Sequence, residues 1–427
     1  MMRQRAIAFV GLAAMACLVA HGAFADDAPQ LFGLRTEFLL FALTLFGVAL
    51  LHERTLEVAV SGLGAIVLLK FLAFGSAFDL PGHLRHEAVI LINLFGLLIG
   101  FAILARHFEQ SGVPAILPRW LPDDWKGGFV LLVMVFVLSA FLDNIAAAMI
   151  GGTVAKHVFR DRLDIGYLAA IVAASNAGGA GSVGGDTTTT MMWIDGVDAA
   201  DVLHAYVAAV PALLLLSVVA ARQQHAHQPI TRDAPRGLGI AWRRVVVVVA
   251  ILLGAIVANV LLDFPAVGVW IVIGLAALFV KTEWRAATSA LKGSLFLLLL
   301  VLAASLMPVE ELPPASWTTA LVLGFVSAVF DNIPLTKLAL DQGGYDWGVL
   351  AYAVGFGGSM IWFGSSAGVA LSGLFPQARS IGAWLWRGWH VVVAYLLGFF
   401  VLLATLGWQP QAPHRAAPQV DSALGTR

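Results

Sequence analysis

The chain has almost no cysteine and few charged residues. A single cysteine, Cys17, occurs in 427 residues, and it lies in an apolar N-terminal segment. Disulfides, thiolate metal sites and a cysteine nucleophile are therefore excluded from the rest of the chain. Charged residues make up 12% of the sequence, against roughly 25% in soluble domains. The sequence also has no nucleotide-binding P-loop and no zinc-type His-Glu motif, which argues against a primary pump and against a metalloenzyme.

Hydrophobic residues make up 60% of the chain, and the mean hydropathy is +0.88. These values predict an all-α polytopic membrane protein whose main partner is the lipid bilayer. The formal net charge of -1 gives no indication of a nucleic-acid partner. A window of roughly 20 residues predicts about ten spans. They are 37–52, 57–79, 87–106, 165–193, 199–221, 243–262, 265–281, 289–306, 347–372 and 383–407.

Residues 1–25 have the pattern of a secretory signal peptide. Arg3 and Arg5 precede an apolar stretch, and Ala23-Phe24-Ala25 is a small-residue cleavage site. The alternative is an uncleaved first span.

One phrase occurs twice, and each copy places an aspartate in apolar sequence. The copies are Ser139-Ala-Phe-Leu-Asp143-Asn144-Ile and Ser327-Ala-Val-Phe-Asp331-Asn332-Ile, so that 188 positions separate 143 from 331. A carboxylate in hydrocarbon is costly, so it must face a cavity, a partner or an ion. The recurrence predicts a duplicated architecture with one acidic site in each half.

The segments that contain these acids, 128–158 and 317–341, are predicted to be re-entrant helical hairpins. If both re-enter, the basic and acidic loop residues fall on opposite sides, and the positive-inside rule places the basic side in the cytoplasm. The hairpins then open toward opposite sides, as in the inverted repeats of secondary transporters. The basic side has Lys156, Arg160, Arg162, Arg222, Arg232, Arg236, Arg243, Arg244, Lys281, Arg285, Lys292, Arg379 and Arg387; the other side has Asp26, Asp27, Asp195, Asp198, Asp201, Asp263, Glu310, Glu311, Asp341 and Asp346.

This arrangement divides the chain into two transport repeats, 26–221 and 243–407. A cytoplasmic linker, 222–242, joins them, and 408–427 forms a tail. We expect a multi-pass protein of the bacterial inner membrane with a cytoplasmic central loop and a periplasmic C-terminus. A homodimer is left open.

Each predicted hairpin is followed by a glycine-rich span, 165–193 or 347–372. Each glycine in a helix costs up to about 1 kcal/mol relative to alanine, so these spans are predicted to be broken helices. The first helix is expected to stop near Asn176 and to restart at Asp186. Close helix packing is the alternative explanation of the glycines. The hinge glycines are Gly178, Gly179, Gly184, Gly185, Gly357 and Gly358.

These motifs resemble the NhaD-type sodium/proton antiporters of the ion transporter superfamily, which also contains citrate and dicarboxylate carriers and arsenite permeases. The sharpest match runs from Asn176 to Trp193, including Gly185-Asp186-Thr-Thr-Thr-Thr. The resemblance implies two inverted repeats, each with a hairpin and a broken helix. Two departures concern the ion site. Ala146-Ala147-Ala148 stands where the family has threonines, and a proline of the glycine run is missing.

A carboxylate in a partly wet cavity can hold either a proton or a sodium ion, so Asp143, Asp186 and Asp331 are the expected exchanging groups. Neutral oxygen donors suit an alkali cation. We expect Na+ at Asp143, Asn144, Asn176 and Asp186, with no cofactor. The candidate polar ligands are Asn144, Asn176, Ser182, Thr187, Thr188, Asn332, Ser365 and Ser366.

Two of the acids also have a purely structural explanation. Lys337, six residues beyond Asp331, could form an ion pair with it that makes burial tolerable. Asp186, at a helix restart, could be an N-cap.

The predicted function is a secondary active Na+(Li+)/H+ antiporter that works by alternating access. The alternative is a sodium-coupled carrier of citrate, a dicarboxylate or another small anion. An intramembrane enzyme is not expected, because the sequence contains no supporting catalytic motif. We expect exchange to depend mainly on the first half, through Asp143 and Asp186.

Overall fold

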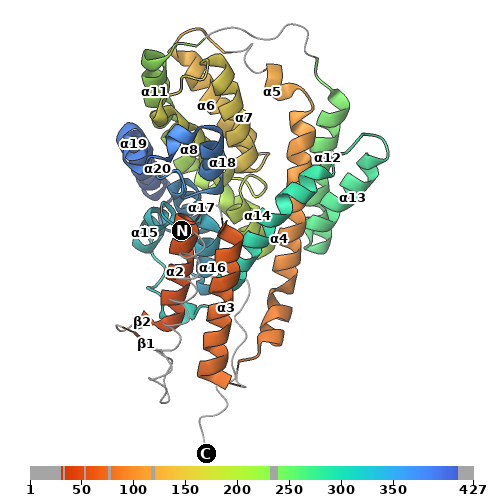
Figure 1. Ribbon diagram of the computed structural model, residues 1–427, viewed down its shortest axis with the longest axis vertical. Helices are drawn as coiled ribbons and strands as arrows, with labels where there is room; N and C mark the ends of the chain where they lie inside the picture. The colour runs from red at the N-terminus through yellow and green to blue at the C-terminus, as the bar shows by residue number, and fades with distance from the viewer. Residues whose placement is uncertain are drawn as a thin grey trace, which may run out of the picture.

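The computed structural model describes residues 30–31, 34–51, 54–75, 78–116, 121–230 and 239–411. The predicted signal peptide, 1–25, lies outside these ranges. Apart from two short antiparallel strands, β1 (Gln30–Leu31) and β2 (Leu34–Arg35), every regular element in the described ranges is helical (Figure 1).

The helices of the first half follow the predicted spans closely. They are α2 (Thr36–Leu50), α3 (Thr55–Phe74), α4 (Leu80–Glu109), α5 (Val113–Ile116), α6 (Trp125–Ser139), α7 (Asn144–Val158), α8 (Ile165–Ala180), α9 (Thr187–Ile194), α10 (Ala199–Leu203) and α11 (Ala205–His227).

The second half follows its predicted spans equally closely. It contains α12 (Trp242–Leu262), α13 (Pro265–Ala277), α14 (Arg285–Ser305), η5 (Val309–Glu311), α15 (Trp317–Ser327), α16 (Asn332–Gln342), α17 (Trp347–Gly357), α18 (Ser366–Leu374), η6 (Pro376–Arg379), α19 (Ile381–Arg387) and α20 (Trp389–Leu406).

Six helical stretches in the described part of the chain are long and apolar enough to cross a membrane, and several shorter apolar helices accompany them. The six are Thr55–Phe74, Leu80–Glu109, Ala199–His227, Trp242–Leu262, Arg285–Ser305 and Trp389–Leu406. The protein is therefore a multi-pass membrane protein.

Several helix boundaries differ from the predicted ones. The last predicted span, 383–407, is divided at Gly388 into α19 and α20, and two other differences have a clear cause. Helix α4 begins at Leu80, earlier than the predicted span at 87, because Asp79 caps it by accepting from the Gly82 N–H at 3.0 Å. Helix α11 continues through His227 into the predicted linker. Its last turn is held by buried Gln224, which accepts from the Asp164 N–H at 2.8 Å and donates to the Arg162 carbonyl at 2.9 Å.

Both segments with an Asp-Asn pair are two helices joined by a short turn, α6 with α7 and α15 with α16. Asp143 and Asp331 are the N-cap residues of α7 and α16, with nearly the same backbone angles (φ −51°, ψ 139° and φ −56°, ψ 139°). The serine before each turn holds it to the next helix. The Ser139 hydroxyl donates to the Ser175 carbonyl at 2.5 Å, and the Ser327 hydroxyl donates to the Val354 carbonyl at 2.8 Å.

The two glycine-rich spans are broken, but the first break starts later than predicted. Helix α8 continues past Asn176 to Ala180, so Gly178 and Gly179 are helical. Close packing explains Gly178, because a Cβ there would overlap the Phe136 carbonyl of α6. Gly357 has the same relation to the Gly324 carbonyl of α15. Close helix packing, the alternative explanation of the glycines, therefore applies to Gly178 and Gly357.

The broken helices form the centre of the molecule. Helix α8 packs against α17, while α7 contacts α18 and α16 contacts α9. Long α4 runs along one side with α12 and α13 beside it (Figure 1). Because α4 also contacts α9, its apolar middle closes over the start of α9, where the candidate site lies.

Candidate functional site

Asp143 and Asp186 line one small cavity of about 20 Å³. Asp143 comes from the turn before α7, and Asp186 comes from the break between α8 and α9. Asp186 is 3% exposed. The Asp143 Oδ1 atom is buried and has no hydrogen-bond partner among the described residues. The other residues that line the cavity are Leu94, Leu97, Leu98, Phe101, Gly184, Thr187 and Thr190.

Asp186 is an N-cap, as the structural explanation predicted, and it also contacts the second half. Its Oδ1 accepts from the Thr188 N–H at 3.3 Å. Its Oδ2 accepts from the side-chain amide of Asn332 at 3.4 Å. The cap uses one carboxylate oxygen and leaves the residue on the cavity wall, so capping and ion binding are compatible here.

The buried amides Asn144 and Asn176 are brought together as predicted. Asn144 Nδ2 donates to Asn176 Oδ1 at 3.1 Å, and Asn176 Nδ2 donates to the Ser359 hydroxyl at 3.0 Å. This chain of hydrogen bonds joins the turn of the first half to the broken helix of the second. Ser359 was missed in the sequence, although its position directly after Gly358 is a signal that could have identified it.

Several hydroxyl groups around the first break donate to main-chain carbonyls. The Ser182 carbonyl accepts from the Thr189 hydroxyl at 2.6 Å, and the Val183 carbonyl accepts from the Thr190 hydroxyl at 2.7 Å. The hydroxyl of the predicted ligand Thr188 is buried and has no hydrogen-bond partner among the described residues. The Ser182 hydroxyl itself donates to the Ala140 carbonyl at 2.6 Å. The threonine run therefore satisfies the unwound segment, and Thr187 is the predicted hydroxyl that lies on the cavity wall.

Asp331 lies apart from the other two acids. Its Oδ1 accepts from the Ile333 N–H at 3.1 Å, and its Oδ2 accepts from the Ser366 hydroxyl at 3.4 Å. It lines a different cavity of about 270 Å³, which shares no residue with the cavity of Asp143 and Asp186. Ser365 does not contact Asp331 in any described hydrogen bond; it caps α18 by accepting from the Gly368 N–H at 3.3 Å.

The suggested ion pair between Lys337 and Asp331 is wrong. Lys337 Nζ lies 3.0 Å from Glu87 of α4 and 2.6 Å from Asp341 of its own helix. Residues four apart lie on one helix face, whereas residues six apart do not. The Lys337 and Glu87 side chains are only 3% and 5% exposed. Glu87 was missed, yet an acid at the start of an apolar span is a signal that it needs a partner.

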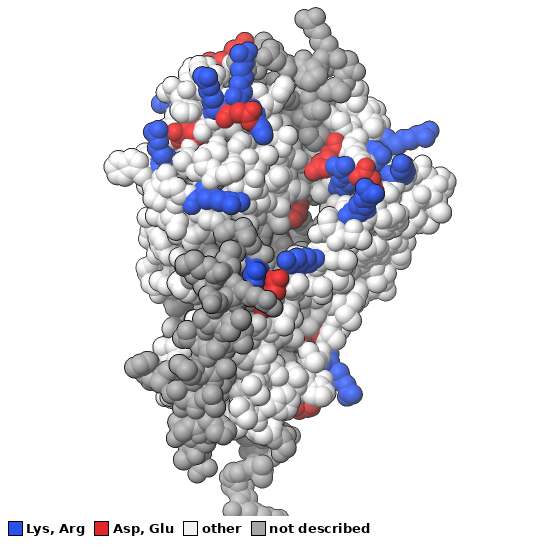
Figure 2. Space-filling model, viewed as in Figure 1, with Lys and Arg blue, Asp and Glu red and all other residues white. Residues whose placement is uncertain are grey.

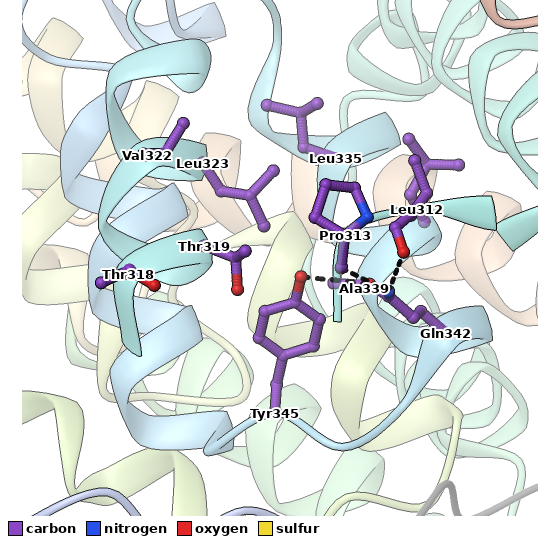
Figure 3. A pocket seen from close by; sticks show the side chains of 11 residues that line it. Leu312, Pro313, Thr318, Thr319, Val322, Leu323, Leu335, Ala339, Gln342 and Tyr345 are labelled. Atoms are coloured by element: carbon purple, nitrogen blue, oxygen red, sulfur yellow. Dashed lines mark hydrogen bonds between the residues drawn. The ribbon is translucent and has the colours of Figure 1, made fainter. Parts of the chain in front are cut away.

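A roomier pocket of about 360 Å³ lies between α15 and α16. Its walls are mostly apolar, and Gln342 and Tyr345 stand at one end, where Gln342 donates to the Pro313 carbonyl at 2.8 Å (Figure 3). No acidic or basic residue lines it. It therefore has no charged group to exchange an ion, and the candidate site remains with the acids.

Comparisons with known proteins agree with this membrane architecture. The citrate transporter family model, CitMHS, matches residues 1–357. Sodium/proton antiporter 1 of Arabidopsis thaliana is 27% identical, covering 84% of this chain and 71% of its own length. Sodium/proton antiporter 2 of the same plant is 28% identical, covering 76% and 90%. The Na(+)/H(+) antiporter NhaD of Vibrio parahaemolyticus is 28% identical, covering 68% and 84%.

The family match extends over most of the chain and includes the first Asp-Asn turn, the first broken helix and the second Asp-Asn turn. It confirms the predicted superfamily and the assignment to transporters and not to enzymes. The chain belongs to the CitMHS citrate transporter family of the ion transporter superfamily, and it is a secondary membrane transporter.

Proposed function

We propose that this chain is a Na+(Li+)/H+ antiporter that exchanges an alkali cation for protons across the bacterial inner membrane. The observation that carries the proposal is the pair Asp143 and Asp186 on the wall of one small cavity. The names of three relatives, all sodium/proton antiporters, point in the same direction.

The cavity suits a cation better than an organic anion. No basic residue lines it, so a citrate or dicarboxylate would meet two carboxylates without a compensating charge. Its volume of about 20 Å³ matches one or two water-sized groups. Because the matching family is described as a citrate transporter family, a sodium-coupled citrate or dicarboxylate carrier is the second candidate.

Exchange follows from competition for the same two carboxylates. A desolvated cation would take oxygen ligands from Asp143 and Asp186, and Thr187 and Thr190 on the same cavity wall are neutral oxygen donors. The predicted amides Asn144 and Asn176 bond to each other and do not line this cavity. When the cation leaves, two bare carboxylates in an apolar cavity are costly, so protons replace it. The same groups then carry either cargo, which couples the two movements without a cofactor.

For alternating access we propose that the two halves are inverted repeats, each with a re-entrant hairpin. Matched local features support this proposal. The N-cap turns at Asp143 and Asp331 have the same backbone conformation, and Gly178 and Gly357 make the same close contact with α6 and α15. In each half, the helix after the Asp-Asn turn contacts the helix after the break of the other half: α7 contacts α18, and α16 contacts α9.

Loop contacts support the proposed sidedness, with a cytoplasmic central loop and a periplasmic C-terminus. Several loops assigned to the cytoplasm meet, as in the ion pair of Arg387 with Asp164 at 3.4 Å. Loops assigned to the other side also meet, since the Gln409 N–H donates to Asp346 at 2.9 Å. Most visible lysines and arginines gather in the upper part of the view in Figure 2. Each of these contacts stays within one predicted side, which supports the proposal that both hairpins are re-entrant.

Proteoliposomes loaded with a pH-sensitive dye test the proposal. Sodium or lithium should trigger proton movement with the wild-type protein, and Asp143→Asn and Asp186→Asn should abolish it. Asp263→Asn is the matched control, because Asp263 is exposed and lies in the turn between α12 and α13. If no alkali cation moves protons but a sodium gradient drives uptake of labelled citrate or succinate, the carrier replaces the antiporter.

A further inference from the structure

We propose that the cavity beside Asp331 binds small amphipathic organic cations, that is, primary ammonium or amidinium compounds with a short apolar body. This cavity has a volume of about 270 Å³, against about 20 Å³ for the cavity of Asp143 and Asp186. The proposal goes beyond alkali-cation exchange, because it assigns Asp331 a ligand of its own.

The charge of the site is negative, and none of its described lining residues is basic. Asp331 is the only ionisable residue among them. Its oxygens accept from two neutral donors, the Ile333 N–H at 3.1 Å and the Ser366 hydroxyl at 3.4 Å. Within the described ranges no lysine, arginine or histidine forms an ion pair with it, and Lys337 is engaged by Glu87 and Asp341. A carboxylate placed in this way attracts a ligand with one positive charge.

The walls of the cavity select for an organic cation. Among the described lining residues, the polar side chains other than Asp331 are those of Thr55 and Ser366, each with a hydroxyl group, and the others are apolar. These are Leu45, Val48, Ile145, Phe296, Val329, Phe363, Val369 and Ala370. A hydrated metal ion would place its water molecules against these apolar side chains, which cannot accept or donate hydrogen bonds. Its binding would therefore be costly. A primary ammonium group can bond to Asp331 and Ser366 while its apolar body covers the walls.

Two aromatic residues strengthen this assignment. Phe296 of α14 and Phe363 of the second break both line the cavity that contains the carboxylate. Aromatic rings attract ammonium and amidinium groups through their negative faces, by roughly 0.5–1 kcal/mol at exposed sites and more when the pair is desolvated. They also give an apolar ring of the ligand a surface on which to stack.

The cavity lies between two groups of elements. One wall comes from α2, α3 and α14, and the other comes from the turn before α16, the second break and the start of α18; Ile145 of α7 also lines the cavity. A ligand that fills it contacts both groups at once. If the proposed antiport cycle moves the hairpin turns relative to α2, α3 and α14, a ligand in this cavity also slows exchange. This consequence rests on the proposed function, whereas binding itself does not.

Isothermal titration calorimetry of the full-length protein in detergent tests binding directly, without any transport step. The probe is benzylammonium, and the matched neutral control is benzyl alcohol, which has the same ring and lacks the charge. We expect saturable binding of benzylammonium and binding of benzyl alcohol that is at least about tenfold weaker. Equal binding of the two probes, or no saturable heat with benzylammonium, would overturn the proposal.

Three variants locate the site. Asp331→Asn removes the charge and Val369→Phe fills the cavity, so each should weaken benzylammonium binding at least about tenfold. Asp143→Asn should bind as the wild type does, because Asp143 lines the other cavity. If Asp331→Asn does not fold, as judged by gel filtration, Val369→Phe decides the question. Loss of binding in Asp143→Asn with retention in Val369→Phe would contradict the assignment.

The outcome is separable from that of the antiport assay. Binding that depends on Asp331, together with proteoliposomes that move no protons in response to sodium or lithium, supports this site and rejects the antiporter. Sodium-triggered proton movement without benzylammonium binding rejects this site and leaves the antiporter in place.

Discussion

Asn332 donates a hydrogen bond of 3.4 Å to the carboxylate of Asp186, although 146 positions separate them in the sequence. Asn332 is the first residue of α16, directly after the turn of the second half, and Asp186 belongs to the break of the first. Because the contact is buried, the second half supplies a polar partner to a carboxylate of the first-half cavity. The two halves therefore form one site at Asp186, while Asp331 keeps a cavity of its own.

Replacement of Asn332 by alanine should weaken sodium binding in the antiport assay. The variant removes a neutral donor from Asp186, and hydrogen bonds to charged groups contribute about 1.5–3 kcal/mol. Because this bond is long, we expect the low end of that range, an increase of about tenfold in the sodium concentration needed for half-maximal proton movement. Asn259→Ala, in a helix without any candidate site residue, is the control. An unchanged sodium dependence would show that Asp186 works without this amide.

Replacement of Lys337 by methionine should destabilise the protein strongly. Lys337 is the cation shared by Glu87 and Asp341, and its removal leaves two carboxylates without a counter-charge in a buried place. Breaking a buried ion pair in this way costs roughly 3–5 kcal/mol. Thermal unfolding in detergent measures the effect, and exposed Lys281→Met serves as the control.

Adding Glu87→Gln and Asp341→Asn to Lys337→Met removes all three charges of this cluster. We expect the triple variant to recover much of the lost stability, because no uncompensated charge then remains. A single Lys337→Met variant that melts at the wild-type temperature would rule out an energetic role for the ion pairs.

Alanine at Gly178 or Gly357 should prevent native packing of the helix pairs. In both places the added methyl group meets a main-chain carbonyl, of Phe136 or of Gly324, which cannot move aside as a side-chain end can. Overpacking of a core typically costs about 1–3 kcal/mol. Folded yield and melting temperature in detergent are the readouts. Gly293→Ala is the matched control, since open space surrounds that position and alanine favours the helix by up to about 1 kcal/mol.

Cysteine labelling tests the proposed sidedness. In a Cys17→Ser background, Asp161→Cys and Glu310→Cys place single thiols at exposed positions that lie on opposite predicted sides. A membrane-impermeant maleimide applied to intact cells should label position 310 and leave position 161 unlabelled until the membrane is opened. Five predicted spans separate the two positions and keep them on opposite sides. Labelling of position 161 in place of position 310 would contradict the assigned sidedness, as would follow if the first hairpin crossed the membrane, and labelling of both would contradict the predicted spans.

Most helices and both breaks were predictable from local sequence. Long apolar runs define the helices because a bilayer requires backbone hydrogen bonds within each segment. The turns before Asn144 and Asn332 were predictable because an acid in an apolar run needs a special position. The exact start of the first break was not predictable, because α8 stays helical beyond Asn176 where Gly178 packs on α6.

The partners of the charged side chains could not be predicted in the same way. The sequence suggested Asp331 of the repeated motif as a partner of Lys337. In the structure Lys337 instead bonds to Glu87 of α4, which is 250 positions away in the chain. The threonine run suggested ion ligands, but the packing of the unwound segment directs the hydroxyls of Thr189 and Thr190 to main-chain carbonyls. Such pairings depend on which helix faces meet, and local sequence does not contain that information.

The amino-acid sequence by itself determined the membrane setting, the helix positions, the duplicated Asp-Asn turns and the transporter superfamily, because hydropathy and short motifs act within a segment. Only the tertiary structure decided that Asp143 and Asp186 share one cavity, that Asn332 reaches Asp186, and that Asp331 faces a larger, mostly apolar cavity. The physical reason is that the size and charge of a cavity depend on side chains from helices far apart in the chain.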